Sequence, residues 1–155
     1  MIREASLTIL GSGTSAGVPI IGCDCAVCRS DDPRDQRTRC SAAIRFVDAT
    51  DQERIIFIDA SPDLRAQVLR HDFQRLDAIL FTHNHVDHTF GLDDVRRFNA
   101  VMRAPIDIYA DPHTMETLSR VYRHIFEKHQ NVNDSFVATL IPHVIHPMQP
   151  IGLFG

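Results

Sequence analysis

The chain of 155 residues lacks the features that would place it in a membrane or on a nucleic acid. It has no uninterrupted apolar stretch long enough to span a bilayer, and no charged segment followed by an apolar run at its start. Its 16 basic and 20 acidic residues are mixed along the chain and give a formal net charge of −4. Since no basic stripe results, a nucleic-acid partner is not favoured. We expect no membrane contact and a cytoplasmic location.

Cysteine is also scarce, with four residues in the chain. Three of the four lie close together, and no signal peptide precedes them, so thiolate ligands of a metal are favoured over disulfides. A hydrophobic content of 44% suffices for one ordinary domain core, and we therefore expect residues 1–155 to form a single domain.

What the chain does contain is a dense group of metal-ligand residues, His83, His85, Asp87 and His88. They follow an apolar run, residues 78–81, that is typical of a buried strand. Alternate positions of an extended segment point to the same side, so His83 and His85 can bind one metal ion, and Asp87 and His88 can face a second. Two ions roughly 3.5 to 4 Å apart can hold and activate a bridging hydroxide. The alternative is a polar loop of solvated histidines.

A second candidate metal site is formed by Cys23, Cys25 and Cys28 within an insertion at about residues 22–40. Three thiolates at this spacing can surround one structural zinc, which needs a fourth ligand. The alternative is a set of reduced surface thiols. Cys40 is the nearest spare thiol, but it precedes an expected strand and is interpreted as a buried apolar cysteine.

Apolar patterning predicts the surrounding elements. Asp59 closes one buried strand, where it can either support a ligating histidine or cap the helix that follows. Glycines 11, 13 and 17 form either a phosphate cradle or a plain tight turn. We expect strands at residues 5–10, 42–47, 54–59, 78–81 and 106–109, with the second and third as an antiparallel hairpin, and helices at 61–70, from 92 onward and from 111 to about 125.

Residues 83–88 resemble the H-x-H-x-D-H motif of the metallo-β-lactamase fold hydrolases. Residues 10–19, 22–28 and 58–63 are similar to the branch that contains the phosphoribosyl cyclic phosphate phosphodiesterase of phosphonate breakdown. The resemblance implies an α/β (α+β) fold, the αββα sandwich, of which this chain looks like the N-terminal half. It further implies that the cysteines bind a structural zinc whose last ligand is a distant histidine, and it favours Asp59 as the partner of a ligating histidine.

The resulting hypothesis is a metal-dependent phosphodiesterase that acts on a small cyclic phosphodiester through a metal-bound hydroxide. His83 and His85 would bind one divalent ion, zinc or manganese, and Asp87 and His88 the other, with Asp87 also orienting the nucleophile. The alternatives are an RNA-processing phosphodiesterase of the same fold, thioester or lactam hydrolysis, and a catalytically incomplete metal-binding module. A half-domain with an open sheet edge would be prone to form a homodimer.

Overall fold

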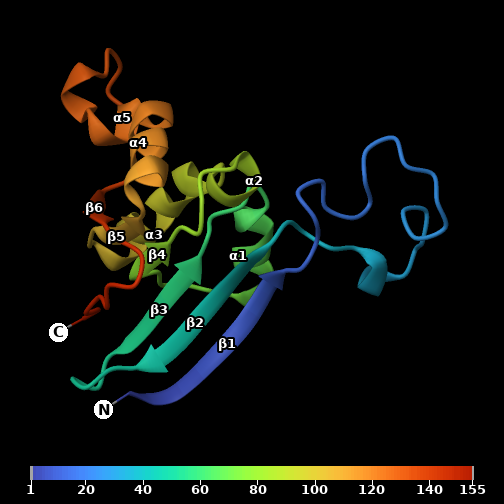
Figure 1. Ribbon diagram of the computed structural model, residues 1–155, viewed down its shortest axis with the longest axis horizontal. Coiled ribbons are helices and arrows are strands. Elements are labelled where there is room, and N and C mark those ends of the chain that lie inside the picture. Colours follow the sequence, from blue (N-terminus) through green and yellow to red (C-terminus); the bar gives the residue numbers. More distant parts are fainter. Residues whose placement is uncertain (1, 155) are drawn as a thin grey trace.

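The computed structural model describes residues 2–154, which contain one mixed six-stranded sheet with its strands in sequential order (Figure 1). The first three strands pair antiparallel and the remaining three continue parallel to the third. This arrangement confirms the expected α/β class and the predicted antiparallel hairpin. The strands are β1 (Arg3–Gly11), β2 (Ser41–Val47), β3 (Glu53–Ile58), β4 (Ala78–Leu80), β5 (Ile106–Ala110) and β6 (Leu140–Val144).

Helices connect the parallel strands, as parallel pairing requires a crossover between successive strands. None of the helices among residues 2–154 has the length and apolar content needed to cross a membrane. The α-helices are α1 (Leu64–His71), α2 (Val86–Thr89), α3 (Arg96–Met102), α4 (Pro112–Val121) and α5 (Arg123–Phe126), and the 3-10 segments are η1 (Pro33–Asp35), η2 (Leu92–Val95) and η3 (Lys128–Gln130).

The two faces of the sheet are covered unequally. Alternate strand positions such as Phe57 and Ile108 point to the face on which α1, α3 and α4 pack, and they belong to the main hydrophobic core. The opposite face carries a smaller cluster around Phe46, Ile56 and Tyr109, against which residues near the described end of the chain pack. The helix-covered face therefore supplies most of the buried apolar area.

Apolar side chains stay exposed on that second face. Leu7 pairs with Ile44 across β1 and β2, so both point to the same side as the smaller cluster. Leu7 is 64% exposed and Ile9 56% exposed. Exposure of this kind on a sheet face indicates a surface that another layer can cover.

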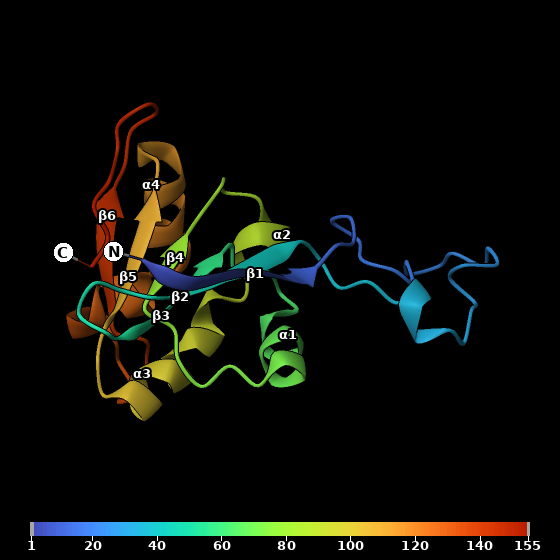
Figure 2. The same cartoon turned by 90° about the horizontal axis from the view of Figure 1, so that it is seen from below.

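Residues 12–40 leave the body of the domain as a long arm between β1 and β2 (Figures 1 and 2). Two isolated backbone bridges, Gly13 to Arg39 and Val18 to Arg37, hold the base of the arm together. The cysteine-containing part of the arm thus stands away from the sheet.

Three local predictions differ from the structure. The helix after β3 begins at Leu64 and not at Ser61, because residues 61–64 form a separate turn in which the N–H of Leu64 donates to the carbonyl of Ser61 at 2.9 Å. The predicted helix after β5 divides at Tyr122 into α4 and α5. The prediction that Cys40 is buried was wrong: its side chain is exposed, since it lies in the loop one residue before β2 begins.

Candidate metal centre

The candidate centre lies at the edge of the sheet where β3, β4 and β5 end. These strands are parallel, so the residues that follow them meet at one edge. Asp59 follows β3, and the loop with His83 and His85 follows β4. The backbone N–H of Ala60 donates to the carbonyl of His88 at 2.7 Å, which fastens these two segments to each other.

The three histidines of the cluster are close neighbours. The ring centroids of His83 and His88 are 4.1 Å apart, and those of His83 and His85 are 4.6 Å apart. Asp87 and His88 belong to the one-turn helix α2, for which His85 is the N-terminal flanking residue. The Asp87 carboxylate lies 3.4 Å from Nε2 of His88. The structure therefore brings all four predicted ligands to one place.

Asp59, directly after β3, contacts this cluster through His88. Its carboxylate lies 2.7 Å from Nδ1 of His88 and accepts hydrogen bonds from the backbone N–H and the hydroxyl of Thr82, both at 2.8 Å. Asp59 is 2% exposed and has a φ of 63°. Of the two interpretations of this residue, the geometry favours a partner of a histidine, because the carboxylate contacts Thr82 and His88, and the residue that flanks the start of α1 is Asp63.

These contacts indicate which ring nitrogens carry protons. A carboxylate accepts hydrogen bonds only, so Nδ1 of His88 must donate to Asp59. The Thr82 hydroxyl donates its single proton to Asp59 and can then only accept, so Nδ1 of His83, at 3.0 Å, donates to it. In neutral imidazoles this leaves the Nε2 lone pair of both histidines available to a metal ion.

Residues outside the motif also hold the loop, and sequence reasoning missed them. The Asn84 amide contacts Nε2 of His113 at 3.1 Å and donates to the Thr117 hydroxyl at 3.2 Å, which ties the loop to α4. The Tyr122 hydroxyl donates to the carbonyl of Thr89 at 2.9 Å. No spacing in the sequence relates these α4 residues to the histidines, because the contacts arise from the packing of a helix onto the loop.

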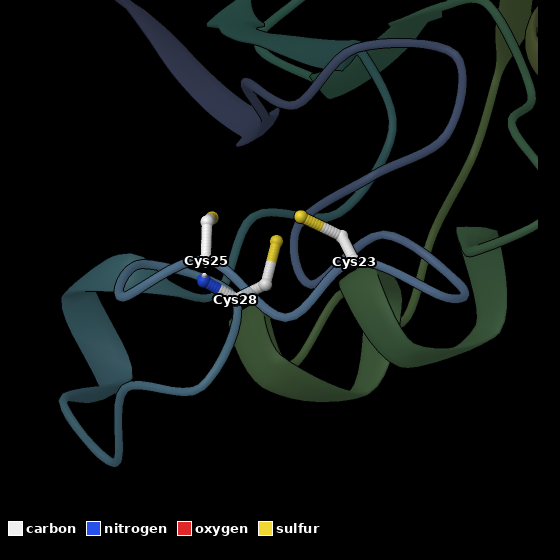
Figure 3. A group of neighbouring side chains, drawn as sticks. All are labelled: Cys23, Cys25 and Cys28. Atoms are coloured by element: carbon white, nitrogen blue, oxygen red, sulfur yellow. Dashed lines mark hydrogen bonds between the residues drawn. The ribbon is translucent and has the colours of Figure 1, made fainter.

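The second candidate site lies on the arm (Figure 3). The sulfur atoms of Cys23, Cys25 and Cys28 all lie within 4.8 Å of one another. Backbone N–H groups point to two of these atoms, from Ile20 to Cys28 at 3.4 Å and from Cys28 to Cys25 at 3.5 Å. Among residues 2–154, these thiols are the one group of three potential ligands whose atoms all lie within this distance of one another. The ligand atoms of the histidine cluster are farther apart.

The local hydrogen bonds affect the ionisation of Cys25. The amide N–H of Cys28 makes the largest contribution, followed by the thiols of Cys23 and Cys28, and together they lower the pKa of the Cys25 thiol from 9.0 to about 7. A large thiolate fraction is then present near neutral pH. Because the thiolate is the form that binds metal, this environment suits a metal ligand.

A mixed sheet with helices on one face and a histidine-rich loop at the carboxyl ends of its parallel strands defines an α/β protein of the metallo-β-lactamase fold. Residues 54–150 match the family described as the beta-lactamase superfamily domain, and the chain belongs to this family.

The chain is similar to proteins with several different names. A crystal structure of a diphosphatase from the PhnP family matches with a TM-score of 0.81 and 40% identity, over 100% of this chain and 55% of that protein. Zinc-bound PqqB from Methylobacterium extorquens matches with a TM-score of 0.59 and 26% identity, over 92% of this chain and 46% of that one.

A curated relative, octanoyltransferase from Porphyromonas gingivalis, is 43% identical over 120 residues, or 77% of this chain and 23% of that protein. The chain thus spans about half the length of the two solved structures and a quarter of this relative. The resemblance to the PhnP family agrees with the motif in the sequence, and the zinc in PqqB shows that a protein of this fold binds a divalent metal.

Proposed function

We propose that the protein is a metal-dependent hydrolase that acts on a small, cyclic phosphodiester. The observation that carries the proposal is the Asp59 carboxylate, 2.7 Å from Nδ1 of His88, beside three histidines at the carboxyl edge of the sheet. Similarity to a diphosphatase, whose name refers to cleavage at phosphorus, favours phosphoryl chemistry over lactam or thioester hydrolysis.

The side chains present fit divalent metal ions. Three imidazoles and one carboxylate are ligands that zinc and manganese both accept. We assign His83 and His85 to one ion, and Asp87 and His88 to a second. Bound divalent ions would lower the pKa of a water ligand and neutralise negative charge on the phosphoryl oxygens. A structural zinc on Cys23, Cys25 and Cys28 would stiffen the arm.

The protein's own groups have separate parts in this proposal. Asp59 keeps the proton of His88 on Nδ1 and fixes the orientation of the ring. Thr82 does the same for His83. We assign to Asp87 the orientation of the attacking water, because its carboxylate lies 3.4 Å from Nε2 of His88, the atom that we assign to a metal ion. The chain spans 55% of the length of the similar diphosphatase. The roles of Asp59, Thr82 and Asp87 are therefore proposed for a complete active site.

Hydrolysis assays with added Mn²⁺ or Zn²⁺ test the proposal. The substrates are a 2′,3′-cyclic nucleotide, bis(p-nitrophenyl) phosphate, a pre-tRNA, a chromogenic lactam and a thioester. We expect phosphodiester turnover that His85→Ala reduces at least 100-fold, while His129→Ala, at an exposed position of η3, leaves it unchanged.

Two results would contradict the proposal. Hydrolysis that is unaffected by His85→Ala would place the activity elsewhere. Metal binding without turnover of any phosphodiester would support the alternative, a metal-binding module.

A further inference from the structure

A polar hollow lies beside the carboxyl end of β1, at the base of the arm. Its volume is about 190 Å³. Three segments meet there: residues 16–19, residues 36–39 before β2, and the helix α1 with its flanking residue Asp63. The lining residues whose side chains carry charge are Arg37, Arg39, Asp63 and Arg70.

The charges in this hollow are unbalanced. Asp63 already has two partners from Arg39, the backbone N–H at 2.8 Å and the guanidinium at 3.0 Å. Arg39 is held in place, because its Nε also donates to the carbonyl of Ser15 at 2.9 Å. Within residues 2–154, the salt bridges include none made by Arg37 or Arg70. Three cations therefore face one carboxylate in a chain whose formal net charge is −4.

Acidic residues that neighbour the hollow in sequence do not line it. Asp35 belongs to η1, and Asp72 follows α1, where its carboxylate accepts a hydrogen bond from Gln74 at 2.7 Å. Arg37 and Arg70, both exposed, therefore have no carboxylate partner among residues 2–154.

We propose that this hollow binds a phosphate group through Arg37 and Arg70. A guanidinium donates two parallel hydrogen bonds to phosphate oxygens, which makes arginine well suited to this anion. The volume is below the roughly 300 to 1,000 Å³ of pockets that enclose an organic ligand, so it fits the phosphate group and not an entire organic molecule. The ligand is inorganic phosphate or the terminal phosphate of a monoester.

The hollow and the histidine cluster are distinct sites joined by one segment, residues 59–63. Asp59 at its start contacts His88, and Asp63 at its end contacts Arg39. Four residue steps span at most about 14 Å. Gln67 on α1 completes the link, since its amide bonds both to Ser61, at 3.2 Å, and to the carbonyl of Arg39, at 2.8 Å. Phosphate binding does not require turnover and goes beyond the proposed function.

Calorimetry with inorganic phosphate, at an ionic strength kept constant with sodium chloride, tests the proposal. The titrations use a His83→Ala/His85→Ala background, so that phosphate bound at a metal centre is not counted and failure of the proposed function has no influence. We expect measurable binding that Arg37→Gln/Arg70→Gln weakens at least tenfold. The control, Arg65→Gln, removes one positive charge, as Arg70→Gln alone does, from an exposed position of α1 that lies outside the hollow, and it should leave binding unchanged.

Equal binding by all three proteins, or no binding of phosphate above that of chloride, overturns the proposal. A parallel titration with glycerol phosphate distinguishes the source: tighter binding than inorganic phosphate assigns the site to a monoester, and weaker binding to the free ion. If the double variant has an altered melting temperature without ligand, the single variants Arg37→Gln and Arg70→Gln replace it. The proposal is overturned if both single variants bind phosphate as tightly as the protein that retains both arginines.

Discussion

The Asp59 carboxylate lies 2.7 Å from Nδ1 of His88, although the two residues are 29 positions apart in the chain. The carboxyl side chain is 3% exposed, and it also accepts two hydrogen bonds from Thr82. One buried carboxylate therefore orients both the residue before the first histidine of the motif and the last histidine. Substitution of Asp59 should therefore disturb both ends of the histidine loop.

Asp59→Asn should weaken divalent metal binding at the histidine cluster by about 10- to 100-fold, the usual effect of losing a partner of a ligating histidine. Asparagine keeps the shape of the side chain and tolerates the positive φ of 63° at this position, whereas alanine would add backbone strain. A competition titration against a chromogenic chelator measures the affinity.

Asp94→Asn is the matched control for this substitution. It removes one negative charge from an exposed side chain in the first turn of η2, near the loop but without a hydrogen bond to it in the described structure. Wild-type affinity in Asp59→Asn, or an equal loss in both variants, would show that the contact with His88 does not support a ligand.

Cys25→Ser should reduce the zinc content of the purified protein by close to one equivalent. The three sulfur atoms lie within 4.8 Å of one another, and the Cys25 thiol, with its pKa lowered to about 7, is ionised in part at neutral pH. Elemental analysis measures the metal, and a His83→Ala/His85→Ala variant should keep this equivalent.

Cys40→Ser serves as the control for the cysteine site, because Cys40 is an exposed thiol outside the cluster. Its zinc content should equal that of the unmodified chain. Zinc that persists in Cys25→Ser would favour the other interpretation of these cysteines, reduced thiols on the surface.

Gly91→Ala should destabilise the protein by about 3 kcal/mol, as overpacking does where the neighbour is backbone. An added Cβ would collide with the carbonyl oxygen of Ser61 and approach Cβ of Leu64 to 2.8 Å. The φ of Gly91 is −90°, so the cost is steric and not conformational. Urea denaturation measures it, and Gly152→Ala, with no atom within 4 Å of the added Cβ, should change stability by less than 0.5 kcal/mol in magnitude, roughly the effect of a surface substitution.

Tyr122→Phe should make the stability of the fold less sensitive to alkaline pH. Burial, with a smaller contribution from Asp93, raises the pKa of Tyr122 from 10.0 to about 12. Between pH 10 and 12 the unfolded chain loses a proton that the folded protein retains, so stability is full below pH 10 and falls as the pH rises through 12. Phenylalanine removes this dependence.

At neutral pH the same variant should lose about 1 kcal/mol, because the hydrogen bond to the carbonyl of Thr89 is gone. Thermal melts from pH 7 to 11.5 provide both values. An unchanged decline above pH 10 would show that Tyr122 is not the group responsible.

The strands could be predicted because their apolar runs are short and bounded by turn residues. β3 and β4 match the predicted positions to within a residue. β6 (Leu140–Val144) was not predicted, since Pro142 and His143 interrupt its apolar pattern and it forms by pairing with β5. The start of α1 was placed too early, because a serine followed by a proline is equally compatible with the turn that residues 61–64 form before the helix.

The candidate ligands were visible for a different reason: residues that bind one metal from a single loop must be close in the chain. His83, His85, Asp87 and His88 fulfil this condition, as do the three cysteines of the arm. The contacts of Asn84 with His113 and Thr117 are 29 and 33 positions apart and left no trace in the spacing. Their roles at a metal centre stay predictions.

The sequence by itself determined the hairpin and two clusters of candidate metal ligands, since periodicity and short-range spacing are local properties of a chain, and the resemblance of its motifs to known proteins indicated the fold family. The tertiary structure alone decided which nitrogen of His88 faces Asp59, that Asp63 binds Arg39, and that Arg37 and Arg70 line one hollow. Each of these depends on how distant segments meet at the carboxyl edge of the sheet, and that meeting is fixed by the packing of the helices against the core.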